Sequence, residues 1–413
     1  MRDKSNLWWR LALLNLAIAA AMGLLLRLMF LVELPITFRA WLHGHSHGAM
    51  LGWLFPAFLI LGLGTLELSP AFHRKALILF ALNQLATLGM FIAFPYQGYG
   101  PISIAFSTLQ VLVSYAFIII SWHPLGRQEG PAGAWWKVAL AFLGLSTMGL
   151  WTLAAVQAGS FRLPELMVLG TQFFLHFQFN GWFLIAAAAL LLQVYVRPGA
   201  HLPGATRLLW LVAFSAILTF ALTMVWVERA AWIYVLNAFG VLLQLGTAVY
   251  GFIILRRGRG AFLPIQNPLA YKLLVFAGLA FACKVLIQSL VAIPPIAIIS
   301  FTLRNFVIGF IHLIMLGILT QTIWSVAIEK KWLTGSSPSL RLSIYTFAFG
   351  VFSTELLLFG QGAMFWAGWG KLPGYYTTIY ALSGTLLLGI IGVNITAWRK
   401  PERSTPPNNC DLP

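Results

Sequence analysis

Long apolar stretches alternate with short polar connections along almost the whole chain. Each stretch supplies the roughly 20 residues that a helix needs to cross the hydrocarbon core of a bilayer. The stretches lie near residues 7–32, 41–66, 76–94, 101–122, 138–158, 165–195, 205–226, 231–255, 271–293, 297–327, 342–363 and 375–397. This pattern predicts an all-α, polytopic membrane protein of about 12 transmembrane helices. We expect one helical domain over residues 1–400 and a disordered cytoplasmic tail over 401–413, which is rich in Pro and Asn.

The composition excludes a soluble protein. Of the 413 residues, 60% are hydrophobic and only 9% are charged, whereas soluble domains carry roughly 25% charged residues. The 17 Trp residues fit a protein with two membrane–water interfaces, where indole rings accumulate. The bilayer is therefore the first expected partner.

The positive charge follows the predicted topology. With 12 spans, 19 of the 26 Lys and Arg residues lie on the side that holds both termini, and three lie within spans. The opposite side has four: Arg39, Arg162, Arg229 and Lys371. Because positive residues stay on the cytoplasmic side, we expect cytoplasmic termini and insertion in the inner (cytoplasmic) membrane. The net charge of +16 is then a topology signal, and no nucleic-acid partner is expected.

Histidines mark three of the predicted spans. His43, His45 and His47 open the second span, His176 lies in the sixth and His312 in the tenth. All three spans run inward from the outside, so these histidines fall in the outer half of the membrane at about 1.5 Å per residue. Polar groups inside a bilayer are costly and often functional. The outer half is therefore predicted to hold a polar site for a metal or haem.

Structural roles would also account for some of these residues. A single buried His is commonly a hydrogen-bonded core residue. Arg304 would serve to neutralise Glu355, and Lys284 would snorkel towards the interface or bond Gln288.

Three of the histidines carry a resemblance to a known family. His47-Gly-Ala-Met with Pro56 downstream, His176 and Gly309-Phe-Ile-His312-Leu resemble subunit I of the haem-copper oxidases and the related nitric oxide reductases. The resemblance implies an oxidase-like bundle with a low-spin haem b held by His312 and by His47 or His45, whose spacing to Pro56 is equally workable. It also implies that Arg304 or Arg27 pairs with the haem propionates.

The chain departs from this family where the reaction centre would be. Phe310 stands at the position of the high-spin haem ligand, the seventh span has no His, and Asn180 stands four residues after His176. We therefore expect a haem-binding protein with a redox, electron-transfer or nitric-oxide-related role, and a quinol or cytochrome as redox partner. If the protein is an enzyme, we expect a membrane oxidoreductase that is not a complete oxygen or nitric oxide reductase.

A second resemblance is to the NnrS-like haem- and copper-containing membrane proteins, which are linked to nitric oxide tolerance. The stretch from Trp41 to Gly52 and the pair His312-Leu313 fit their pattern. Copper or another metal is then a further candidate cofactor. Its candidate ligands are His43, His47, His176 and His312.

Transport is the alternative class of function. The tract His43-Gly-His45-Ser-His47 is typical of zinc transporters, because spaced imidazoles chelate Zn²⁺. An anion carrier that uses the intramembrane cations Arg27, Lys284 and Arg304 is a third interpretation.

Overall fold

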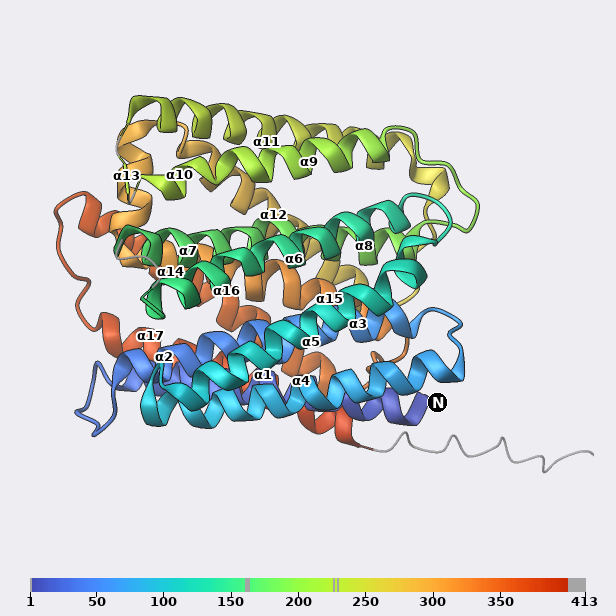
Figure 1. Ribbon diagram of the computed structural model, residues 1–413, viewed down its shortest axis with the longest axis horizontal. Helices are drawn as coiled ribbons and strands as arrows, with labels where there is room; N and C mark the ends of the chain where they lie inside the picture. Colours follow the sequence, from blue (N-terminus) through green and yellow to red (C-terminus); the bar gives the residue numbers. More distant parts are fainter. Residues whose placement is uncertain (1, 160–163, 226, 229, 400–413) are drawn as a thin grey trace, which may run out of the picture.

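The computed structural model describes residues 2–159, 164–225, 227–228 and 230–399. Within these ranges the chain is helical, and its only β-type pairing is an isolated bridge between Val196 and Phe262. Twelve helices are long and apolar enough to cross a membrane, which confirms the prediction of an all-α polytopic membrane protein (Figure 1). The predicted tail at 401–413 lies outside the described residues.

The spans are built from the following elements, with three of them interrupted by π-helical segments. In chain order they are α1 (Arg2–Leu28); α2 (Phe38–His47), η1 (Gly48–Leu54) and α3 (Phe55–Gly64); α4 (Pro70–Gln97); α5 (Pro101–Gly126); α6 (Ala132–Gln157); α7 (Pro164–His176), η2 (Phe177–Phe183) and α8 (Leu184–Tyr195); α9 (Ala205–Thr219) and α10 (Ala221–Met224); α11 (Ala231–Arg257); α12 (Pro268–Leu290); α14 (Arg304–His312), η4 (Leu313–Thr320) and α15 (Gln321–Glu329); α16 (Pro338–Trp366); and α17 (Tyr375–Trp398). Two short elements, η3 (Arg259–Ala261) and α13 (Pro294–Thr302), lie in connections.

The tenth span is shorter than the hydrophobic pattern predicts. The apolar run 297–327 is broken at Leu303, whose backbone is extended (φ −86°, ψ 107°). The residues before it form the separate helix α13, which starts at a Pro-Pro pair, and the span itself begins at Arg304. A continuous apolar run does not show such a break, because hydropathy reports polarity and not backbone direction.

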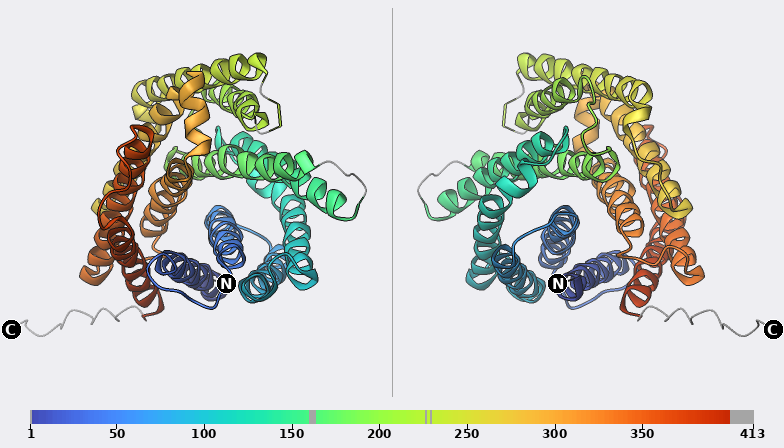
Figure 2. Two further views of the ribbon diagram at one scale, coloured as in Figure 1. Left: turned by 90° about the vertical axis from the view of Figure 1, so that its left-hand side faces the viewer. Right: turned by 90° about the vertical axis from the view of Figure 1, so that its right-hand side faces the viewer.

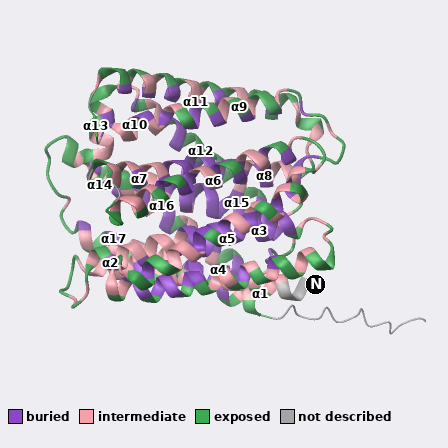
Figure 3. Ribbon diagram, in the orientation of Figure 1, coloured by how far each residue is buried: buried purple, intermediate pink, exposed green. Residues whose placement is uncertain are grey.

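Three spans form the centre of the bundle. In the second, sixth and tenth spans, 83%, 72% and 61% of the most apolar window is buried, against 22–50% in the other nine. Figure 3 shows the same contrast, with buried residues concentrated along α3 and α15 and exposed residues along α9 and α11. The outer helices therefore present their apolar faces to lipid, and the three central spans pack against protein.

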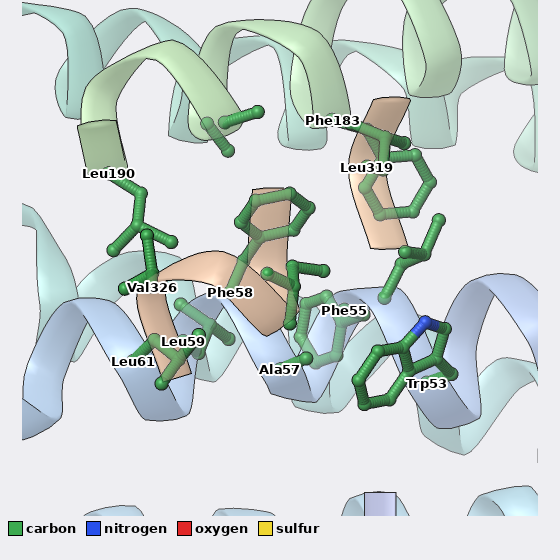
Figure 4. Packing of buried hydrophobic residues seen from close by; sticks show 14 of the residues in the cluster. Trp53, Phe55, Ala57, Phe58, Leu59, Leu61, Phe183, Leu190, Leu319 and Val326 are labelled. Atoms are coloured by element: carbon green, nitrogen blue, oxygen red, sulfur yellow. The ribbon is translucent and has the colours of Figure 1, made fainter. Parts of the chain in front are cut away.

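Large side chains join the three central spans to one another (Figure 4). The rings of Phe58 and Phe183 lie 6.3 Å apart between the second and sixth spans. The Trp53 indole Nε1 donates a hydrogen bond of 3.1 Å to Thr320 Oγ1 between the second and tenth spans. Because a buried polar group is costly without a partner, this bond also fixes how the two spans are rotated against each other.

The chain winds round the bundle and returns to its start. Seen end-on, its colours follow one another around the molecule from blue to red (Figure 2). The last span meets the first through the Asn394 amide, which donates to the carbonyl of Leu13 at 3.0 Å, and through Arg10, which lies 5.2 Å from the centre of the Trp398 ring. The start of α1 and the end of α17 thus lie at the same end of the bundle (Figure 1).

Candidate functional site: three histidine-bearing helices

A π-helical segment begins directly after one histidine in each central span. The segment η1 follows His47, η2 follows His176 and η4 follows His312. These histidines come eight to eleven residues after the starts of their spans, which is roughly 12–17 Å along a helix at about 1.5 Å per residue. Because π-helical turns are rare and occur often at functional sites, three of them at one depth single out this layer.

The three segments share a sequence motif that the hydrophobic pattern did not reveal. Each histidine is followed five positions later by a glycine, in the pairs His47 and Gly52, His176 and Gly181, and His312 and Gly317. A π-turn joins residues five apart, so this spacing matches the backbone. The three motifs stand in the second, sixth and tenth of the twelve spans, at intervals of four spans.

The motif glycines allow close approach of the preceding span. A Cβ atom on Gly181 would lie 2.5 Å from the ring of Phe142, and one on Gly317 would lie 3.2 Å from the Cβ of Ala280. A Cβ on Gly52 would lie 3.3 Å from the Cβ of Asn15 and still closer to Thr87. Each motif therefore fixes a tight helix contact beside its histidine.

His45 and His312 face each other across the second and tenth spans. Their ring centres lie 6.5 Å apart, with an angle of 60° between the planes. The His45 Nδ1 lies 2.7 Å from the carbonyl oxygen of Ala19 on the first span, and the His312 ring interacts with the carbonyl of Ile308 on its own helix. The Ala19 carbonyl takes up one nitrogen of the His45 imidazole and leaves the other for a ligand.

Charged residues of the first, tenth and eleventh spans surround this pair. Arg27 lies close enough to interact electrostatically with both histidines, with Glu355 and with Arg304. Glu355 is only 8% exposed, and neither of its carboxyl oxygens has a hydrogen-bond partner. This combination of cations and an unsatisfied carboxyl group is typical of a binding site rather than of a packed core.

The expected pairing of Arg304 with Glu355 is absent from the described residues. The Arg304 guanidinium instead lies 5.3 Å from the centre of the Phe38 ring, and it is solvent-accessible at the start of α14. Arg27 is the cation that interacts with Glu355. The sequence could not show which of the two arginines interacts with Glu355, because Arg27 and Arg304 lie at similar depth.

His43 and His47 face away from this pair into a separate cavity. They lie on the opposite side of α2 from His45, as the helical spacing predicts, and their ring centres are 6.4 Å apart. Both line a cavity of about 770 Å³ that extends between the second, third, fourth, fifth and sixth spans. His47 Nδ1 bonds the carbonyl of His43 at 2.9 Å, one helical turn earlier.

His176 lies in a third place, beside a buried lysine. Its Nε2 lies 2.7 Å from the carbonyl oxygen of Ala216, and Lys284 is near enough to interact with it electrostatically. Lys284 is 1% exposed, so it does not snorkel, and the side-chain oxygen of Gln288 has no partner. The expected bond between Lys284 and Gln288 is thus not formed.

The four candidate metal ligands do not converge. His43 and His47 share the cavity, His312 faces His45, and His176 is bonded to the seventh span. Among the described residues there is no cluster of three or more His, Cys, Asp or Glu side chains that could hold a metal ion. What the structure does bring together is His312 with His45 and Arg27, with Arg304 nearby.

No protein-family model matches the chain, and no curated protein shows significant similarity to it. The function must therefore be inferred from the arrangement of the residues themselves.

Proposed function

We propose that this membrane protein binds one low-spin haem b, with His45 and His312 as its axial ligands, and serves in electron transfer. The separation of 6.5 Å between the two ring centres carries the proposal. Two imidazoles on opposite faces of one metal ion, each bonded at about 2 Å, have their centres roughly 6–6.5 Å apart.

The hydrogen bonds of the two imidazoles fit axial ligation. A metal-bound His usually donates its other ring N–H to a carbonyl or carboxylate, which fixes the tautomer and the ring orientation. The Ala19 carbonyl, 2.7 Å from His45 Nδ1, serves His45 in this way, and the Ile308 carbonyl is the backbone group that interacts with His312. A Cβ atom on Gly23 would lie 2.8 Å from the His45 ring, so this glycine gives the ring the room to hold that orientation.

Arg27 and Arg304 would bind the propionate groups, because guanidinium groups pair well with carboxylates. Bound haem supplies a one-electron couple whose potential depends on its ligands and on nearby charge. The imidazoles of His45 and His312 would hold the iron, and Arg27 and Arg304 would place positive charge beside it. A quinol or a cytochrome is the proposed redox partner.

A complete oxygen- or nitric-oxide-reducing centre is not part of this proposal. Such a centre needs a five-coordinate haem and a second metal ion. Phe310 provides no ligand atom and packs against the hydrophobic core, and among the described residues His176 is not part of a cluster of three His, Cys, Asp or Glu side chains that could hold a second metal ion.

Zinc transport through the His43–His45–His47 tract has less support. His45 faces His312, whereas the other two rings face the cavity. Three imidazoles that point to opposite sides of a helix do not chelate one ion.

We also propose that both termini are cytoplasmic and that the histidine layer lies in the outer half of the inner membrane. The excess of Lys and Arg at the end of the bundle that holds the termini supports this orientation.

The test is the haem content of purified His312→Ala protein. His176→Ala serves as the matched control, because it removes a histidine of the same motif that does not face His45. We expect His312→Ala to lose the low-spin spectrum and His176→Ala to keep it. Full haem content with unchanged bands in His312→Ala would contradict the assignment.

A further inference from the structure

The cavity beside His43 and His47 is a second binding site, and the proposed haem does not use it. At about 770 Å³ it is within the range of roughly 300–1,000 Å³ that holds small organic ligands. It extends from the outer ends of the second and third spans, at Arg39 and Tyr99, down to Gln110 and Gln178 near the centre of the bundle.

Two hydrogen-bond acceptors at the deep end of the cavity lack partners. Gln110 and Gln178 line the cavity and are each 1% exposed, yet neither amide oxygen has a hydrogen-bond partner. Their NH₂ groups are occupied, because Gln110 donates to Asn83 at 2.9 Å and Gln178 donates to Ser146 at 3.0 Å. These bonds hold both oxygens free for a ligand that donates hydrogen bonds.

A third unpartnered group lies higher in the cavity. The Nε2 atom of His43 is buried and has no hydrogen-bond partner, and the His43 ring packs edge-on against Tyr99 with 4.5 Å between centres. Burial raises the pKa of the Tyr99 phenol above its ordinary value, so this ring stays uncharged. At the deep end the lining groups Gln110 and Gln178 are amides, which carry no charge.

Apolar side chains form much of the remaining wall, including Leu51, Ile104, Val111, Leu150 and Trp151. Ile104 and Trp151 are also 38% and 45% exposed, so the wall is continuous with the apolar surface of the fourth and fifth spans. A ligand with a polar ring and an apolar tail fits both features.

From these contacts we propose that the cavity binds an uncharged dihydroxyarene, the chemical class of quinol headgroups, with its hydroxyl groups donating to Gln110 and Gln178. A haem is a poorer occupant of this cavity, because it has no hydroxyl or amine donor for the two amide oxygens. A bare metal ion is also poorer, since His43 and His47 have no third His, Cys, Asp or Glu ligand among the described residues. The site lies on the opposite face of α2 from His45, but ligand binding here does not depend on the haem.

The first test compares two redox forms of one ligand on the wild-type chain. Purified protein in lipid nanodiscs is titrated calorimetrically with decylubiquinol and with decylubiquinone, which offers acceptors only. Binding of the quinol at least tenfold tighter than the quinone is expected, which corresponds to about 1.4 kcal/mol. Equal affinities, or no binding of the quinol, would overturn the proposal.

The second test uses variants and a tail-free ligand. Gln178→Met should weaken quinol binding at least tenfold, whereas Gln244→Met, which alters a glutamine with an unpartnered oxygen outside the cavity, should leave it unchanged. Equal losses of quinol affinity in both variants would contradict the site.

The tail-free ligand shows which kind of dihydroxyarene the cavity takes. Dimethylhydroquinone that binds as tightly as decylubiquinol would indicate a water-soluble dihydroxyarene. Much weaker binding would indicate the lipid-borne quinol. A second haem per chain that is lost in His47→Ala would overturn the proposal. All of these titrations are repeated on haem-free His312→Ala protein, so that failure of the haem assignment and failure of this site give different results.

Discussion

The imidazole rings of His45 and His312 lie 6.5 Å apart, although one opens the second span and the other lies in the tenth. The His45 ring is held by the carbonyl of Ala19, 2.7 Å from its Nδ1. The 6.5 Å between the ring centres is the spacing that the proposed ligation of one haem by both imidazoles requires, and Arg27 lies beside the pair. The neighbouring His47 faces a different cavity.

This relationship predicts different effects for two histidines that are only two positions apart. His45→Ala should lose most of the bound haem, because one axial ligand is removed. His47→Ala should keep haem and its low-spin bands, because His47 faces the other side of α2. Pyridine haemochrome quantification of both purified variants checks this. Haem loss in His47→Ala with retention in His45→Ala would reverse the assignment.

The protein should not reduce oxygen or nitric oxide. With both axial positions of the proposed haem taken by His45 and His312, the iron would have no open position for a gas. Haem-replete protein that is supplied with a reduced quinol or cytochrome c should show no consumption above a haem-free control, and no carbon monoxide shift. Cyanide-sensitive turnover that disappears in His176→Ala would show that a reaction centre exists.

The twelve spans and the relative orientation of the histidines on α2 could be predicted from the sequence. Hydrophobic runs predicted twelve spans, and the spacing of His43, His45 and His47 predicted that His45 points away from the other two. What the spacing could not show is which side of α2 faces the tenth span. That choice depends on tertiary contacts such as the bond between Trp53 and Thr320, which link residues far apart in the chain.

The His and Gly motif of the three central spans was present in the sequence but was not found by the search for hydrophobic patterns. The His and Gly of each motif are separated by four residues that differ among the units, as in His176-Phe-Gln-Phe-Asn-Gly181 and His312-Leu-Ile-Met-Leu-Gly317. A spacing of five matches a π-turn and not the 3.6-residue period of an α-helix. A search for α-helical faces therefore passes over it.

The motif glycines should be required for packing. Gly181→Ala places a Cβ 2.5 Å from the Phe142 ring, and overpacking of this kind costs about 1–3 kcal/mol. Gly278→Ala is the matched control, since this helical glycine has no atom within 4 Å of an added Cβ. Thermal unfolding in detergent should show a lower Tm for Gly181→Ala and little change for Gly278→Ala. Equal Tm values for the two variants would mean that the close contact is not important.

The orientation is tested by cysteine labelling in a background without Cys283 and Cys410. A cysteine at Gly260, where an added Cβ meets no atom within 4 Å, should be protected from an impermeant maleimide in intact cells and react after lysis. A cysteine in place of Trp369, which is 76% exposed at the opposite end, should react in intact cells. The reverse pattern would invert the topology and place the histidine layer in the inner half.

The most direct measurement for the central claim is the visible absorption spectrum of the purified wild-type protein, with haem and protein quantified on the same sample. Two imidazole ligands on one iron should give sharp reduced α and Soret bands of a low-spin haem b, at one haem per chain. The bands should be unchanged by carbon monoxide. A protein without haem after expression in haem-sufficient cells, or with a five-coordinate high-spin haem that binds carbon monoxide, would contradict the assignment of His45 and His312 as axial ligands.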